Sequence, residues 1–182
     1  MNTPNKLTVL RMILVPVFMV LMMFDALTCQ MSGLAVFIVA SITDWLDGYL
    51  ARRDNLISDF GKFMDPLADK MLTTAAFLVI MEKGFISSWV LLIILFREFL
   101  VSGIRLVAVG KGKVIAASMW GKAKTVSQMI AIIASLVLMN ISVLSPSVTY
   151  IAINVLVWIS TILTLLSGAD YVIKNKSFIN TK

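Results

Sequence analysis

The chain has 182 residues, 59% of them hydrophobic, and its mean hydropathy is +0.95. Soluble domains are about half apolar, so this composition excludes an ordinary soluble protein and indicates a membrane protein. The formal net charge is +6, and the chain contains no histidine. Because the basic residues flank apolar segments, we expect anionic lipid headgroups and phosphorylated substrates as partners, and no nucleic acid. The single cysteine, Cys29, excludes an intramolecular disulfide and a cysteine-cluster metal site.

Six apolar segments follow one another along the chain, and each is long enough to cross a bilayer as a helix. They run over residues 7–24, 32–53, 59–81, 87–109, 121–139 and 148–173. No repeat and no long linker divides them, so the sequence predicts an all-α polytopic membrane protein. We expect residues 1–182 to form a single domain, a bundle of six transmembrane helices with a polar cavity that faces the cytoplasm.

The basic residues predict how this bundle is oriented in the membrane. If the N-terminus is cytoplasmic, twelve of the sixteen Lys and Arg residues lie at or near the cytoplasmic face, and only Lys83 falls in a turn on the opposite side. Basic residues are enriched in cytoplasmic loops. The sequence therefore predicts a multi-pass plasma-membrane protein with both termini, and the polar site, on the cytoplasmic side.

Four aspartates interrupt the second and third apolar segments, where an ionisable group is costly unless it is paired, hydrated or bound to metal. Asp44 and Asp47 are three residues apart, and Asp65 and Asp69 are four apart, so each pair shares one helix face. The short connection over residues 54–58 makes the two helices neighbours. Four facing carboxylates cannot all stay ionised without a cation, and hard oxygen ligands suit Mg²⁺, Mn²⁺ or Ca²⁺. We predict that the four aspartates bind a divalent metal, and four carboxylates can serve two ions.

Small residues accompany the two aspartate pairs. Gly48 and Ala51 continue the face of the first pair, and Gly61 lies one turn before the second pair. They leave room for a ligand beside the metal, although small residues also serve helix–helix packing. Arg52, at the end of the second segment, can pair with a phosphate or anchor the helix at the membrane surface.

The aspartates and their small neighbours form one pattern of eight positions within 26 residues, Asp44-x2-Asp47-Gly48-x2-Ala51-Arg52-x8-Gly61-x3-Asp65-x3-Asp69. This pattern resembles the signature of the CDP-alcohol phosphatidyltransferase family, and the resemblance extends over the whole chain as a six-helix architecture. It implies two divalent ions (Mg²⁺ or Mn²⁺), a CDP-linked lipid donor, transfer of a phosphatidyl group to an alcohol, release of CMP, and a homodimer.

The resemblance also implies roles for individual residues. The metal ligands are Asp44, Asp47, Asp65 and Asp69. The residues along the CDP-lipid are Asp44, Gly48, Ala51, Arg52, Gly61 and Asp65. Asp69 is the predicted catalytic base, and the absence of histidine agrees with a carboxylate in that role.

Further polar and basic residues bear on the acceptor alcohol. The predicted ligands of an acceptor phosphate are Thr8, Arg11, Arg97, Arg105, Lys122 and Lys124. The sequence blocks that contain them resemble those of family members whose acceptor is sn-glycerol 3-phosphate and whose product is phosphatidylglycerol phosphate. A phosphorylated acceptor carries about two negative charges and calls for several cations in one cavity. For Glu98 we expect a role in orienting a neighbouring arginine.

Other interpretations stay open at this point. Arg97 can pair simply with Glu98 or Asp59. Lys122 and Lys124 can anchor the protein to anionic lipid. Within the same family, inositol phosphate or serine are alternative acceptors. A small cation-coupled transporter is a further alternative, because buried carboxylates also mark ion pathways. Against it, the four aspartates cluster toward one face, and beyond Arg105 the only acidic residue is Asp170.

Overall fold

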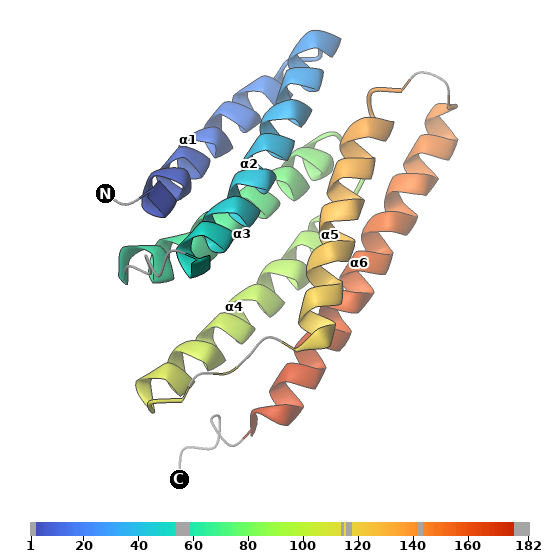
Figure 1. The fold of residues 1–182 in the computed structure, drawn as a ribbon. Helices are drawn as coiled ribbons and strands as arrows, with labels where there is room; N and C mark the ends of the chain where they lie inside the picture. The colour runs from blue at the N-terminus through green and yellow to red at the C-terminus, as the bar shows by residue number, and fades with distance from the viewer. Residues whose placement is uncertain (1–2, 54–58, 114, 116–117, 142–143, 177–182) are drawn as a thin grey trace. The chain divides into compact units, whose positions relative to one another are not determined.

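The computed structural model describes residues 3–53, 59–113, 115, 118–141 and 144–176, without the side chains of residues 3–4, 45, 47–52 and 59–63. In this part of the chain all regular structure is helical (Figure 1). The helices are α1 (Thr3–Met23), α2 (Leu27–Arg53), α3 (Asp59–Glu82), α4 (Ser88–Gly110), α5 (Met119–Leu138) and α6 (Pro146–Lys174). The prediction of an all-α protein with six helical segments is confirmed.

The largest difference from the predicted boundaries lies at the start of α2, which begins five residues before the expected Ser32. The backbone N–H groups of Cys29 and Gln30 both donate to the carbonyl oxygen of Ala26 and so close the first turn. The residues before Ser32 include the polar Thr28 and Gln30, and the predicted apolar segment did not include them. In apolar surroundings, however, the backbone gains more from closing its own hydrogen bonds than side-chain polarity suggests.

Four of the helices have the length and composition needed to cross a membrane, in windows spanning Asn5–Met23, Leu27–Asp44, Met119–Leu138 and Pro146–Lys174. They belong to α1, α2, α5 and α6, and they support the prediction of a polytopic membrane protein. The other two helices, α3 and α4, are also long, but every 18-residue stretch of each contains at least three charged residues. Those residues include Asp65, Asp69, Arg97, Glu98 and Arg105, which the sequence analysis assigned to the site or its surroundings.

The helices form two compact units, and each is described by itself. The first unit contains α1, α2, α3 and the segment 136–143, with α1 packed against both α2 and α3 (Figure 1). Phe18 of α1 and Phe37 of α2 are fully buried, and their ring centroids lie 5.7 Å apart. Aromatic packing therefore holds the first two helices together.

The second unit contains α4, α6 and most of α5, with α4 packed against α6. The buried face of α6 is lined by small polar residues, namely Thr149, Ser160, Thr161, Thr164 and Ser167. Gln128 of α5 donates to the Thr164 hydroxyl at 3.1 Å. Small side chains let helix backbones approach closely, and hydrogen bonds between helices add to the packing. The prediction that the whole chain is a single domain stays a prediction.

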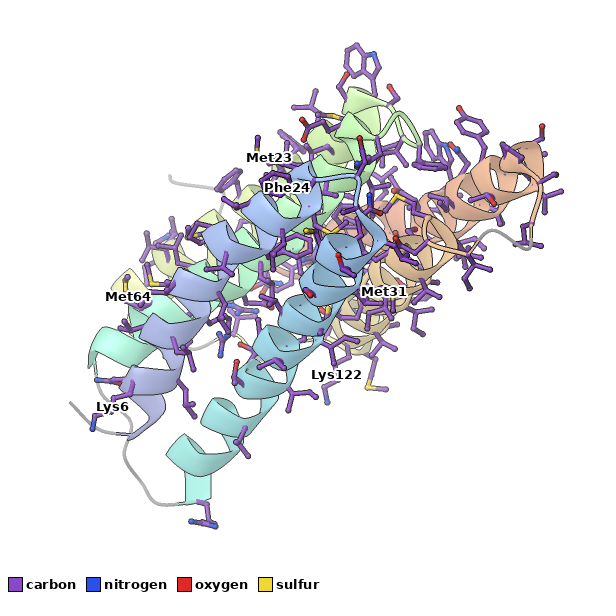
Figure 2. The ribbon with its side chains drawn as sticks, turned by 90° about the horizontal axis from the view of Figure 1, so that it is seen from above. Lys6, Met23, Phe24, Met31, Met64 and Lys122 are labelled. Carbon is purple, nitrogen blue, oxygen red and sulfur yellow. The ribbon has the colours of Figure 1, made fainter. Side chains whose placement is uncertain are left out.

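A polar contact links the end of α3 to the turn that follows Phe24, which lies at the other end of α1 from Lys6 (Figure 2). Lys83, just after α3, donates to Asp25 Oδ1 at 2.6 Å in the turn between α1 and α2. This hydrogen bond and the charge of Lys83 lower the pKa of Asp25, a group outside the membrane-spanning windows. The next residue, Gly84, has a φ of +81°, a conformation that favours glycine, and starts the turn toward α4.

We expect Phe37→Ala to destabilise the first unit by about 3 kcal/mol, the low end of the usual Phe→Ala range, because detergent or lipid is as apolar as the core. The matched control is Phe99→Ala, which truncates a ring that is 68% exposed and should leave stability unchanged. Thermal unfolding of both purified variants in detergent measures the difference. Equal unfolding midpoints would contradict the packing described for α1 and α2.

Candidate active site

Two polar side chains of α1 hold two of the predicted metal ligands. Arg11 Nη1 lies 2.6 Å from Asp44 Oδ1, and the Thr8 hydroxyl donates to Asp65 Oδ1. Both α1 residues are fully buried. They are three positions apart and so share one helix face, which places the carboxylates of α2 and α3 at about the same level along α1. The sequence analysis expected α2 and α3 to be neighbours, and these contacts agree with that expectation.

The chemistry of this cluster fits a hard divalent cation. Arg11 and Thr8 hold the carboxylates of Asp44 and Asp65 beside one face of α1. The Asp44 side chain is 39% exposed, so a ligand can reach it. Carboxylate oxygens are the ligands that Mg²⁺ and Mn²⁺ prefer. Over the described residues, no group of three or more acidic, His or Cys side chains comes together to hold a metal.

The structure describes the side chain of only one of the other two predicted metal ligands. Asp69 lies one turn beyond Asp65 on α3 and is half-buried, and the Thr73 hydroxyl donates to its carbonyl oxygen at 3.2 Å. The side chain of Asp47 lies outside the described residues. The same holds for most of the predicted donor-binding set, namely Gly48, Ala51, Arg52 and Gly61. Their backbone belongs to α2 and α3.

A second charge cluster lies in the second unit, where α4, α5 and α6 meet. Glu98 Oε1 accepts from Arg97 Nη1 at 3.2 Å, and it also accepts from the Lys124 ammonium group. Arg97 Nε donates to the Ser167 hydroxyl at 3.2 Å. Arg97 is only 8% exposed and Lys124 only 6%. Charged groups are rarely buried to this extent unless they are paired or functional.

The structure places the six predicted acceptor ligands in different surroundings. The predicted role of Glu98 agrees with its contacts, since it joins Arg97 to Lys124. Arg105 and Lys122 are exposed (Figure 2 labels Lys122). Thr8 and Arg11 lie in the first unit, on the aspartates. For all six residues, binding of the acceptor stays a prediction.

The sequence analysis missed two residues of α6 that contact Arg97, namely Ser167 and Gly168. Their signal in the sequence is weak. Thr164, Ser167 and Gly168 are small and recur at helical spacing, a pattern that indicates helix packing. Nothing in that pattern names an arginine as the partner.

The helices and their charge clusters define a polytopic membrane protein in which each unit contains buried charged residues. The sequence model of the family described as CDP-alcohol phosphatidyltransferase matches residues 1–166. The chain therefore belongs to the CDP-alcohol phosphatidyltransferase family, and it is an enzyme.

Relatives of known name cover nearly the whole chain. A protein of Bacillus subtilis is 40% identical, over 99% of this chain and 98% of its own length. Proteins of Rickettsia bellii and Haemophilus influenzae are each 35% identical over 93% of this chain, covering 93% and 91% of their own lengths. All three are named CDP-diacylglycerol–glycerol-3-phosphate 3-phosphatidyltransferase.

We expect Glu98→Gln to destabilise the second unit by about 3 kcal/mol, because it removes the negative charge on which two buried cations converge. The matched control is Glu82→Gln at an exposed position near the end of α3, which should leave stability unchanged. Thermal unfolding in detergent compares the two variants. A Glu98→Gln protein as stable as the control would show that the cluster does not depend on this charge.

Proposed function

We propose that the enzyme transfers the phosphatidyl group of CDP-diacylglycerol to sn-glycerol 3-phosphate, giving phosphatidylglycerol phosphate and CMP. The observation that carries the choice of acceptor is the buried cluster of Arg97, Lys124 and Glu98, which has two positive charges and one negative charge. A phosphorylated alcohol suits such a site, whereas a neutral or zwitterionic acceptor has no need of buried cations. The three relatives described above are named for the same donor and acceptor, which supports this choice.

The four aspartates Asp44, Asp47, Asp65 and Asp69 would hold two divalent ions, Mg²⁺ or Mn²⁺. When bound, such ions neutralise the pyrophosphate of the donor and stabilise the departing CMP. Arg11 and Thr8 keep the carboxylates of Asp44 and Asp65 in place through their contacts from α1. Fixed carboxylates lose little entropy when they bind a ligand, so these contacts favour a preformed site.

The donor lies along α2 and the start of α3 in this proposal. Gly48, Ala51 and Gly61 give the nucleotide a close approach to the helix backbones, and Arg52 pairs with a phosphate of the donor. Asp69 takes the proton from the acceptor hydroxyl as that oxygen attacks the phosphorus of the phosphatidyl group. A carboxylate suits this role because the chain has no histidine and lysines near phosphates stay charged.

The acceptor phosphate binds Arg97 and Lys124 in this proposal, and Arg105 and Lys122 bind it from exposed positions. The basic residues near the termini and in the loop after α4 support an orientation with both termini, and the site, on the cytoplasmic side of the plasma membrane. The water-soluble acceptor is then available from the cytoplasm. We propose a homodimer as the working assembly, by analogy with the family.

The acceptor is tested with purified protein, CDP-diacylglycerol and Mg²⁺, by measuring CMP release with glycerol 3-phosphate, inositol phosphate, serine and glycerol. We expect turnover with glycerol 3-phosphate alone. Arg105→Ala should raise KM for glycerol 3-phosphate about tenfold, the scale of one charged hydrogen bond, and leave KM for the donor unchanged. Equal or faster turnover with another alcohol would overturn the acceptor assignment.

We expect Asp69→Asn to lower kcat about 100-fold or more, the scale of general-base removal, while donor binding is largely kept. Asp44→Asn and Asp65→Asn should abolish CMP release without unfolding the protein. Asp25→Asn, an equivalent change at an exposed turn, is the control and should keep full activity.

Titration of Mg²⁺ against Asp69→Asn separates its two proposed roles. Restoration of kcat at high Mg²⁺ would assign Asp69 to metal binding alone and exclude it as the base. Full activity of Asp44→Asn or Asp65→Asn at low Mg²⁺ would rule out the proposed metal site.

A further inference from the structure

Arg97 lies unusually close to the backbone of α6. A Cβ atom built on Gly168 would stand 2.9 Å from Arg97 Cγ and 3.8 Å from Arg97 Cβ. Carbon atoms without a covalent bond do not approach to 2.9 Å, since optimal contact lies near 3.5–4.0 Å. Glycine is therefore the residue that lets the aliphatic stem of Arg97 rest on α6. Gly168 is itself buried.

The neighbouring Ser167 fixes the direction of the same arginine. Its hydroxyl donates to the Thr164 carbonyl oxygen at 2.9 Å, which holds the hydroxyl hydrogen on the α6 backbone. The oxygen lone pairs are then directed at Arg97, whose Nε donates to them at 3.2 Å. Ser167 is fully buried, so water does not compete for this acceptor.

The remaining edge of the guanidinium group faces α4 and the start of α5. Nη1 donates to Glu98, and a Cβ atom on Gly121 would lie 3.9 Å from Nη2. Gly121 belongs to the first turn of α5, and Lys124 lies in the next turn. Nε is used by Ser167, so the Nη2 side of the group is turned toward the part of α5 that carries the second cation.

We propose that Ser167 and Gly168, the α6 seat, are positioning residues for the acceptor: they hold Arg97 so that its Nη2 edge, together with Lys124, meets the phosphate. This inference rests on the proposed function. The match to the family ends at residue 166, so the seat is not among the features by which the family was recognised. Its role is indirect, because neither residue offers a positive charge to a phosphate.

Gly168→Ala tests the seat, because one methyl group forces the Arg97 stem away from α6. We expect KM for glycerol 3-phosphate to rise about tenfold or more, the scale of a weakened charged hydrogen bond, with KM for CDP-diacylglycerol unchanged. Gly103→Ala is the matched control on α4, since a Cβ atom there meets nothing within 4 Å. It should change neither constant.

Ser167→Ala provides a second and milder test, since it removes the acceptor for Nε without adding an atom to the core. We expect the same selective rise in KM for the acceptor, and Ser167→Thr, which keeps a hydroxyl, should restore part of it. If Gly168→Ala alone unfolds in a thermal scan, Ser167→Ala decides the matter. Seat variants that leave the acceptor KM unchanged, or raise both KM values equally, would overturn the proposal.

Arg97→Ala separates failure of the seat from failure of the proposed function. If Arg97→Ala raises KM for glycerol 3-phosphate and the seat variants do not, the cluster binds the acceptor and the seat inference is wrong. If Arg97→Ala leaves that KM unchanged, the acceptor site assigned to the cluster is wrong as well.

Discussion

The structure depends on one constraint, which is the cost of an ionised side chain among apolar helices. Each buried charge needs a partner within hydrogen-bonding distance, and an adjacent turn of the same helix often cannot supply it. The chain meets this need with contacts between helices: Arg11 of α1 with Asp44 of α2, and Lys124 of α5 with Glu98 of α4. The charged residues of the two clusters therefore also determine which helices are neighbours and where along their axes these helices contact each other.

Much of the fold follows from the sequence, because the length of an apolar run and the need to close backbone hydrogen bonds together predict a helix. The six predicted segments lie within a few residues of α1 to α6, apart from the early start of α2. The contact of Glu98 with Arg97 could also be anticipated, since adjacent opposite charges in an apolar segment favour a shared polar cluster. The partners of Thr8 and Arg11 could not, because they depend on which helix faces α1.

The α6 seat shows why contacts made by small residues are the hardest to predict. A glycine has no side chain that makes the contact. Its effect depends on how closely another side chain can approach its backbone. Gly168 and Gly103 are both helical glycines in the second unit, but a Cβ atom would meet Arg97 at one and nothing at the other. Gly168 is buried against Arg97 and Gly103 is exposed, a difference that belongs to the tertiary structure.

The two charge clusters also reflect a problem set by the proposed reaction, which joins two anions. The repulsion between a pyrophosphate and a phosphate grows as the dielectric constant falls, so each must be neutralised where it binds. Carboxylates can do this only by recruiting cations from solution, and their ligand geometry then positions the ion. Arginine and lysine carry a positive charge of their own, but their long side chains are flexible. Without restraint, the charged groups would be poorly positioned to bind a phosphate. A cluster of built-in cations therefore needs packing that restrains the stems, and the contacts of Arg97 with Glu98, Ser167 and Gly168 supply it.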